Sequence, residues 1–380
     1  MPWSLGGPFE TMKGVGMHPG RWAAMVIMLI GLPPAGVLLG GGSLAPYLEF
    51  PPRSRFIAHA PFSWSAFILI SVFVLICIWP PIKSLAQRPT AGARQATSRR
   101  SLPWWGWGGL VLVAAAWFLA WTRFPWFTAL QPHTFPMLWG AFILVVNGDT
   151  LRRSGTCLMT AHPLGFLSLF PASAGFWWVF EYLNRFVQNW YYTGADYPPM
   201  TYFLLATLSF ATVLPAVLSV RQWLLSFPWL GGILRGKRLP ARYTSPMAAR
   251  GALAVSGMGL VLAGGAPNFG FPFLWLSPPA IVLAAQMLSG SCPLIDSARR
   301  GEWATVVAAA LAGLFCGLFW ELWNFHSLAR WSYSVPFVDR FRLFEMPLLG
   351  YAGYLPFGLE CILIGDMILG WRRHRRDPAR

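Results

Sequence analysis

About ten apolar stretches, each long enough or nearly long enough to cross a bilayer, follow one another along the chain. They cover approximately residues 22–41, 62–82, 104–122, 134–148, 163–182, 201–222, 250–266, 272–289, 304–322 and 346–370. Roughly 20 apolar residues in a helix span the hydrocarbon core, where only helices and closed barrels satisfy every backbone hydrogen bond. The sequence therefore predicts an all-α polytopic membrane protein with about ten transmembrane helices, several of them kinked by internal prolines.

Charged side chains are scarce and unevenly distributed, which favours a membrane protein over one that binds nucleic acid. They make up 11% of the 380 residues, whereas a soluble domain carries roughly 25%. The formal net charge is nevertheless +16. Because the basic residues gather in loops beside apolar stretches, anionic membrane lipids are the expected partner and nucleic acid is not.

The basic loops alternate along the chain, and this alternation predicts its orientation. Most of the Lys and Arg residues lie at 83–100, 152–153, 221–242, 299–300 and 372–380. Since cytoplasmic loops are enriched in Lys and Arg, both termini are predicted to lie in the cytoplasm. The strong preference for Arg over Lys, with abundant Ala, Gly and Trp, indicates GC-rich coding DNA. The predicted location is therefore the cytoplasmic (inner) membrane of a bacterium.

One motif occurs twice, at the ends of the fifth and ninth apolar stretches. Residues 180–184 read FEYLN and are followed by WYY at 190–192, whereas residues 320–324 read WELWN and are followed by WSY at 331–333. The shared pattern is an aromatic residue, Glu, two residues, Asn and then Trp-x-Tyr. A carboxylate in an apolar stretch is costly, so its presence indicates a function.

Further matches extend this motif to a whole unit of four helices. LW at 138–139 recurs at 274–275, SGTC at 154–157 recurs as SGSC at 289–292, and LPAVL at 214–218 recurs as LPFGL at 355–359. Four helices return the chain to the same side, so the copies are predicted to form a parallel duplication and not an inverted repeat. The predicted domains are a two-helix addition with a basic loop (1–100), a first four-helix unit (101–245) and a second unit with a basic tail (246–380).

Both copies of the motif supply candidate ligand-binding residues at the predicted outer face. A Glu and an Asn three positions apart share one face of a helix, and the pair offers acceptors and an amide donor. The candidates are Glu181, Asn184, Glu321, Asn324, Trp331 and Tyr333. The alternative is structural: the carboxylates would cap the following loop, pair with Arg185 and Arg330, or bond across the pseudo-symmetric interface. The Trp-x-Tyr elements would then anchor the chain at the membrane interface.

The second copy alone carries further polar residues, which makes it the better candidate for an asymmetric site. His326 lies close to Asn324, Glu345 opens the last apolar stretch, and Glu360 lies within it. An acid there is expected to face the protein interior or a water-filled cavity. Glu321 is the predicted catalytic acid or base, and Glu360 is a deeper proton relay. Asn324, His326 and Glu345 would position the ligand. A neutral Glu360 bonded to a backbone carbonyl is the structural alternative.

Neither a metal site nor a particular cofactor is predicted. His59, His133 and His326 map to the outer side and are weak candidates for metal ligands. Their spacing is long and includes no HxH or HxxxH pair. The five Cys residues show no CxxC spacing, so neither a disulfide framework nor a thiolate metal site is indicated.

Three classes of function remain open at this level, and the sequence does not decide whether catalysis occurs. The preferred class is binding or modification of a lipid, isoprenoid or quinone-like amphiphile between two helix bundles. The second is a structural or quinol-binding subunit of a larger membrane complex. In helix number and duplication alone, the predicted architecture is similar to the quinol-binding membrane subunits of some respiratory complexes. The third is a transporter, for which the apolar stretches offer few polar residues.

Overall fold

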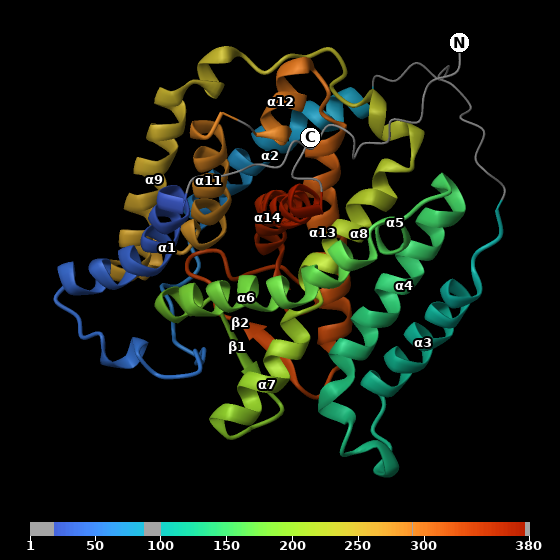
Figure 1. The fold of residues 1–380 in the computed structure, drawn as a ribbon. Helices are drawn as coiled ribbons and strands as arrows, with labels where there is room; N and C mark the ends of the chain where they lie inside the picture. Colours follow the sequence, from blue (N-terminus) through green and yellow to red (C-terminus); the bar gives the residue numbers. More distant parts are fainter. Residues whose placement is uncertain (1–18, 87–99, 291, 377–380) are drawn as a thin grey trace.

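The computed structural model describes residues 19–86, 100–290 and 292–376, with side chains described as far as Gly370. The helices are α1 (Pro19–Leu39), α2 (Trp64–Ala86), α3 (Trp104–Trp121), α4 (Thr134–Ser154), α5 (Leu158–Ala161), α6 (Pro163–Val187), α7 (Pro199–Phe210), α8 (Val213–Leu225), α9 (Pro246–Gly265), α10 (Pro267–Gly270), α11 (Phe273–Leu288), α12 (Pro293–Arg300), α13 (Ala304–Phe325) and α14 (Tyr354–Arg376). The strands are β1 (Trp190–Thr193), β2 (Arg330–Tyr333), β3 (Arg342–Leu343) and β4 (Met346–Pro347). Figure 1 shows this order. Most of the predicted basic loop at 83–100, and part of the basic tail, lie outside the described residues.

The helices confirm an all-α polytopic membrane protein. Within the described parts of the chain, nine helical segments are long and apolar enough to cross a membrane, and a tenth is counted if α11 and α12 form one bent span. The prediction of about ten transmembrane helices agrees with this number. The four short strands contribute only two small ribbons.

Several helix boundaries differ from the predicted ones. The fourth stretch was expected to be short, but it belongs to a helical segment of 24 residues, Gln131–Ser154. The eighth stretch forms α11, which has only 16 residues. The sixth is interrupted between Phe210 and Val213. Pro215 has no N–H to donate to the carbonyl of Ala211, which weakens the helix at this point.

The helices of the two halves make similar sets of contacts. α3 lies along α4, and α9 lies along α11. α8 packs against α4, α6 and α13, whereas α14 packs against α11, α13 and α6. In Figure 1, α8 and α13 are side by side, and α14 is seen nearly end-on beside them. α6 and α8 therefore meet α13 and α14 at the centre of the molecule.

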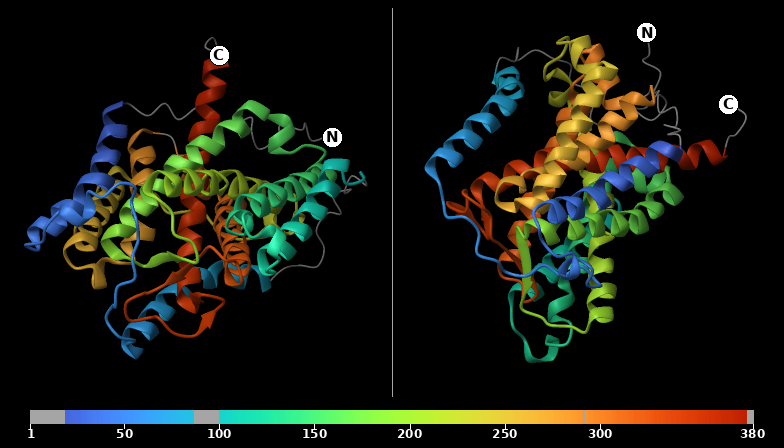
Figure 2. Two further views of the ribbon diagram at one scale, coloured as in Figure 1. Left: turned by 90° about the horizontal axis from the view of Figure 1, so that it is seen from below. Right: turned by 90° about the vertical axis from the view of Figure 1, so that its left-hand side faces the viewer.

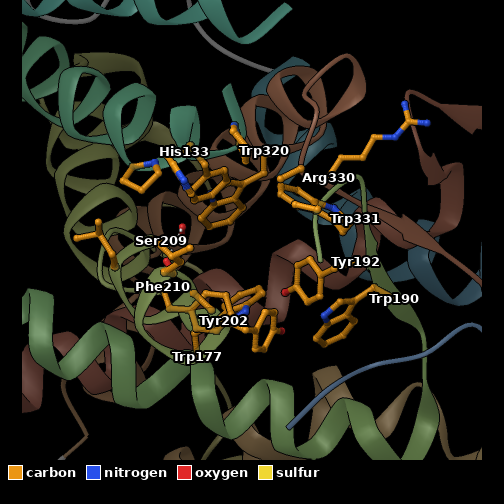
Figure 3. A pocket seen from close by; sticks show the side chains of 18 of the residues that line it. His133, Trp177, Trp190, Tyr192, Tyr202, Ser209, Phe210, Trp320, Arg330 and Trp331 are labelled. Atoms are coloured by element: carbon orange, nitrogen blue, oxygen red, sulfur yellow. Dashed lines mark hydrogen bonds between the residues drawn. The ribbon is translucent and has the colours of Figure 1, made fainter. Parts of the chain in front are cut away.

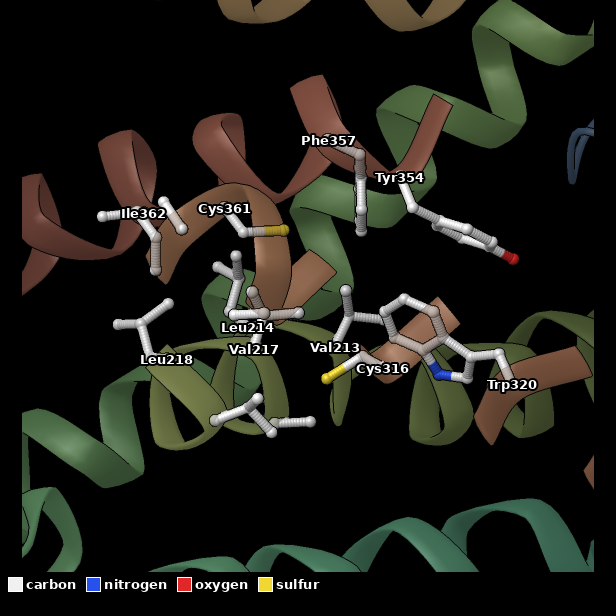
Figure 4. Close-up of a cluster of buried hydrophobic side chains, with 14 of the residues drawn as sticks. Val213, Leu214, Val217, Leu218, Cys316, Trp320, Tyr354, Phe357, Cys361 and Ile362 are labelled. Carbon is white, nitrogen blue, oxygen red and sulfur yellow. The ribbon is translucent and has the colours of Figure 1, made fainter. Parts of the chain in front are cut away.

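A cluster of buried side chains holds this centre together. Figure 4 shows Val217 and Leu214 of α8, Cys316 of α13, and Phe357 and Ile362 of α14. All five are fully buried. Close packing of such side chains, together with backbone contact at small residues, stabilises helix association where lipid offers no hydrophobic driving force. The cluster fixes the position of α13 and α14, which carry part of the site described below.

Glycine allows α1 to lie against α9 with their backbones in contact. A Cβ atom at Gly264 would overlap the carbonyl oxygen of Pro33, and one at Gly36 would overlap that of Val261. At Gly257, by contrast, a Cβ atom would meet only the tips of Leu32 and Met28, at 3.4 Å and 3.5 Å. Small residues at a helix interface allow this close approach.

Replacement of Gly264 by alanine is therefore expected to destabilise the protein by about 1–2 kcal/mol, because the added methyl group forces the two backbones apart. Gly257→Ala provides the control on the same helix, and its stability should be unchanged or slightly higher because alanine favours a helix. Thermal unfolding of the purified proteins in one detergent measures the difference. Equal midpoints for the two variants would contradict the close contact at Gly264.

Helix α2 stands apart from the other helices. It has no buried residue along its length, and Figure 2 shows it separated from the bundle in the right-hand view. Its exposed side chains are large and apolar, among them Ile68, Leu69, Phe73 and Ile76. Such a surface is what a helix surrounded by lipid requires, and it is also available to a partner in the membrane.

Candidate functional site

The two Trp-x-Tyr segments pair with each other as an antiparallel ribbon. β1 follows α6, β2 follows α13, and their register places Trp190 opposite Tyr333 and Tyr192 opposite Trp331. The ribbon thus joins the two sequence copies directly. The aromatic side chains of both strands are held beside the ends of the two helices that carry the Glu-x-x-Asn motifs.

Asn184 and Asn324 hold the two strands to their helices. The amide of Asn184 donates to the carbonyl of Trp190 over 2.8 Å and accepts from the N–H of Asn189, also over 2.8 Å. The amide of Asn324 donates to the carbonyl of Trp331 over 2.7 Å and accepts from its N–H over 2.8 Å. Backbone groups of the strands and loops thus already bond to both side-chain amides, which were predicted to bind a ligand.

Glu181 is fully buried and accepts three hydrogen bonds on one oxygen. The Oε1 atom receives the indole N–H of Trp177 over 3.0 Å, that of Trp190 over 3.1 Å, and the hydroxyl of Tyr192 over 2.5 Å. Hydrogen bonds to an ionised acceptor are stronger than those between neutral groups. The first motif therefore forms a closed cluster of one carboxylate and three aromatic donors.

Glu321 has a closely similar environment in the second copy. Its Oε1 atom receives the hydroxyls of Tyr333 over 2.6 Å and Tyr354 over 2.7 Å, and the indole N–H of Trp331 at 3.4 Å. The Trp331 indole also donates to the Tyr333 hydroxyl over 2.8 Å. Two of the three donors thus come from the strand that follows the helix, as they do for Glu181.

The third donor differs between the copies. Trp177 lies one helical turn before Glu181, and the equivalent place before Glu321 is Gly317. A Cβ atom at Gly317 would overlap the ring of Tyr354. The absence of a side chain there makes room for Tyr354, which reaches Glu321 from α14 and replaces the missing indole.

The second oxygen of each carboxylate has no partner. Oε2 of Glu181 and Oε2 of Glu321 are buried and accept no hydrogen bond. Within the described ranges, no ion pair includes either residue. Burial raises the pKa of Tyr192 and of Tyr333 well above the ordinary value, and the neighbouring carboxylate adds to the rise. These phenols therefore remain protonated donors.

A cavity of about 380 Å³ lies directly in front of the two carboxylate clusters. Figure 3 shows rings on several sides of it. Its wall is rich in aromatic residues, among them Trp177, Trp190, Trp275, Trp320, Trp331, Tyr192, Tyr202, Tyr333 and Tyr354. The six donors that bond to the carboxylates all belong to this wall, whereas the carboxylates themselves lie behind it.

Apolar side chains of two predicted membrane spans line part of the cavity. Met137 of α4 and Leu208 of α7 belong to this lining and are exposed, with 47% and 58% of their surface accessible. Both lie within helical segments that are long and apolar enough to cross a membrane.

The other predicted catalytic and positioning residues do not line the cavity. The ring of His326 lies edge-on to that of Trp121, with centroids 4.8 Å apart. Glu345 lies 3.8 Å from Arg330 and 3.8 Å from Arg342. Glu360 is buried in α14, and its Oε2 atom has no partner. The structure thus brings Glu181, Glu321, Trp331 and Tyr333 together.

The three histidines weighed as metal ligands are held in different places. His59 approaches the side chain of Asn268 at 3.1 Å and the carbonyl of Gln188 at 3.3 Å. His133 lines the cavity, and His326 contacts Trp121. In the part of the chain that the structure describes, no group of three or more His, Cys, Asp or Glu could hold a metal ion.

Several residues of the cavity wall were not candidates from the sequence. Trp177 could have been found, because it precedes Glu181 by four positions and residues at that spacing are neighbours on a helix. Tyr354 is 33 positions from Glu321, and Tyr202 comes from a different helix. Only the tertiary packing reveals these two.

Comparisons with known proteins place the chain in no family. No protein-family model matches it, and no curated protein or solved structure shows a significant similarity. The cavity and the two buried carboxylates are therefore the basis on which a function is proposed.

Proposed function

We propose that this membrane protein binds the polar head of a lipid, isoprenoid or quinone-like amphiphile in the aromatic cavity. The observation that carries the proposal is the form of the cavity, which has a volume of about 380 Å³, a wall rich in aromatic rings and exposed apolar residues in its lining. Pockets for small molecules have volumes of roughly 300–1,000 Å³ and mostly apolar linings. The head of an amphiphile suits this space, while its chain remains in the bilayer.

The distribution of charge supports a position of the cavity toward the outer leaflet of a bacterial cytoplasmic membrane. Arg152 and Arg153 lie in the last turn of α4, whereas His133 lines the cavity just before its first turn. Basic loops favour the cytoplasmic side. With this orientation both termini are cytoplasmic, and the cavity opens on the opposite side.

A duplicated four-helix unit, 101–245 and 246–380, accounts for the symmetry of the site. If Trp190 corresponds to Trp331 and Tyr192 to Tyr333, a two-fold axis exchanges the two strands. The pair of Trp190 with Tyr333 then maps onto the pair of Trp331 with Tyr192, and both pairs occur in the ribbon. The proposed ligand site lies where the two copies meet.

Chemistry on the ligand would involve Glu321 through its phenol donors. Tyr333 and Tyr354 line the cavity and donate to the same carboxylate oxygen, so a proton exchanged with a ligand would pass through a hydroxyl. Binding requires no such step. Modification of the ligand, unlike its binding, would require proton transfer through Glu321.

Filling the cavity tests the proposal. Ala206 lines the cavity from α7, and in Ala206→Trp an indole would occupy much of the space. Extraction of the purified protein and mass spectrometry of the extract should show an amphiphile in stoichiometric amount with the wild type. We expect at least a tenfold lower amount with the variant, since the head loses its volume.

Leu204→Trp is the matched control for this experiment. Leu204 lies on the same helix but is 60% exposed and does not line the cavity, so the variant should retain the amphiphile. If Ala206→Trp retains it to the same extent as Leu204→Trp, or if the wild type carries none above the level of bulk lipid, the proposal is wrong.

A structural role in a larger membrane complex is the second candidate, and one observation favours it. Helix α2 has no buried residue, which leaves a broad apolar surface, including Leu69, Phe73 and Ile76, available to another subunit. Copurification of a second membrane protein that protects α2 from a lipid-phase cross-linker would support this role.

A further inference from the structure

We propose that the head bound in the aromatic cavity is a quaternary ammonium group, as in a choline-type lipid. This inference rests on the proposed function and specifies the chemical class of its ligand. Three features support it: the rings that surround the space, the buried carboxyl groups behind them, and the bonds that already engage six hydrogen-bond donors of the wall.

The rings supply the surface that an organic cation requires. Five of the residues that line the cavity are tryptophans and five are tyrosines. The face of an aromatic ring carries negative electrostatic potential, indole is the strongest of the common rings, and cages of such rings recognise quaternary ammonium groups. Figure 3 shows Trp177, Trp190, Trp320 and Trp331 arranged around one space rather than on one side of it.

Two buried acidic groups lie close behind the rings. Glu181 and Glu321 are both fully buried, and neither takes part in an ion pair in the described parts of the chain. Buried charges in proteins are normally paired. A cation in the cavity would favour the ionised form of these groups and would be its positive partner, separated from them by one layer of rings.

Six donors of the wall are unavailable to a neutral head, whereas the buried hydroxyl of Tyr202 has no partner. Trp177, Trp190 and Tyr192 donate to Glu181, and their counterparts around Glu321 are used in the same way. A sugar or quinone head could use these six donors only by breaking those bonds. A quaternary ammonium group has no N–H and forms no hydrogen bond, so the engaged donors cost it nothing.

The one arginine of the lining does not oppose a cation. The guanidinium of Arg330 extends away from the rings in Figure 3. Its Nη1 atom donates to the carbonyl of Phe325 over 3.1 Å and lies 3.8 Å from the carboxylate of Glu345. The positive charge is therefore outside the space that the rings enclose.

A pair of probes that differ in a single atom tests the inference. One is the dodecyl ether of choline, and the other is the dodecyl ether of 3,3-dimethylbutanol, in which carbon replaces the charged nitrogen. Each is titrated into the full-length protein in nanodiscs of digalactosyldiacylglycerol, a lipid without net charge or ammonium group, with tryptophan fluorescence as the readout. We expect the cation to bind at least tenfold more tightly. One or two cation–π contacts supply a difference in binding free energy of that order.

The double variant Glu181→Gln/Glu321→Gln assigns this preference to the carboxylates. It keeps the size of both side chains, so the neutral probe should bind as before while the preference for the cation falls to about threefold or less. Glu302→Gln is the control, because Glu302 is an exposed residue outside the cavity. Should the double variant not fold, Trp320→Leu, which removes one ring and no hydrogen bond, should also weaken the cation selectively.

Each outcome distinguishes this inference from the proposed function. Equal affinity for the two probes would overturn the ammonium head and leave the amphiphile site intact. Failure of both probes to bind would contradict the proposed function itself. Displacement of the cationic probe by aqueous choline would support recognition of the ammonium group and identify a soluble ammonium compound as a sufficient source. Displacement by a choline lipid alone would show that the chain is needed as well.

Discussion

Replacement of Gly358 by leucine is expected to prevent assembly of the centre of the molecule. A Cβ atom at Gly358 would overlap the carbonyl oxygen of Ala309, and one at Gly313 would overlap that of Tyr354. α13 and α14 therefore touch through their backbones, and no rotamer of a larger side chain relieves the overlap. Overpacking of a core typically costs about 1–3 kcal/mol and sometimes more. We expect about 3 kcal/mol or more here, because backbone must move and not a side chain.

Gel filtration and thermal unfolding of the purified variant measure this effect. Gly175→Leu is the matched control, since a Cβ atom at Gly175 in α6 would meet nothing within 4 Å. That variant should elute and unfold like the wild type. A Gly358→Leu protein that remains monodisperse with an unchanged unfolding midpoint would show that α13 and α14 do not pack as described.

The sequence was sufficient for the fold class because the bilayer imposes one requirement on every segment. A helix must satisfy its own backbone and present an apolar surface, and both conditions are visible in apolar stretches. The ends of the helices were harder to predict from the sequence. Pro215 breaks the sixth stretch, and the helical segment from Gln131 to Ser154 runs through polar residues such as Asn147. Asn147 is tolerated there because it donates to the hydroxyl of Ser219 over 2.8 Å, a contact between helices.

The candidate site was predictable in part, for a similar reason. Glu181 and Glu321 were conspicuous because a carboxylate in an apolar stretch needs a compensating environment. The sequence did not show which residues provide that environment. Donors to Glu321 come from a strand and from α14. Gly317 stands where the first copy has Trp177, and the structure explains this difference because the ring of Tyr354 occupies the space.

Asn184 and Asn324 are a second example of contacts that the sequence alone did not show. Their spacing from the two Glu residues suggested a shared ligand, but each amide instead fixes the strand that follows its helix. Without that anchoring, the Trp-x-Tyr segments would not face the carboxylates. The asparagines thus act on the cavity by positioning its rings.

The Glu321→Leu variant is expected to be less stable than Glu321→Gln by about 2–4 kcal/mol. Leucine removes the acceptor of the Tyr333 and Tyr354 hydroxyls, and a buried donor left without a partner costs about 1–3 kcal/mol. Glutamine keeps one acceptor oxygen but introduces an amide N–H group where Oε2 has no partner, which offsets part of the difference. Both variants are uncharged, so the gain from no longer burying a carboxylate is the same in each and cancels in the comparison. Unfolding in mixed detergent micelles measures the two free energies.

Tyr354→Phe, introduced into the wild type and into Glu321→Leu, shows whether the missing acceptor is the cause. In the wild type it removes one of three donors to Glu321 and should destabilise the protein by about 1–2 kcal/mol. In the Glu321→Leu background it removes a hydroxyl that already lacks a partner, so stability should be unchanged or should rise. Contacting residues couple in this way, and independent ones give additive effects. If the two losses are additive, the Tyr354 hydroxyl is not bonded to Glu321. The inference that Tyr354 takes the place of the Trp177 donor in the second copy would then be wrong.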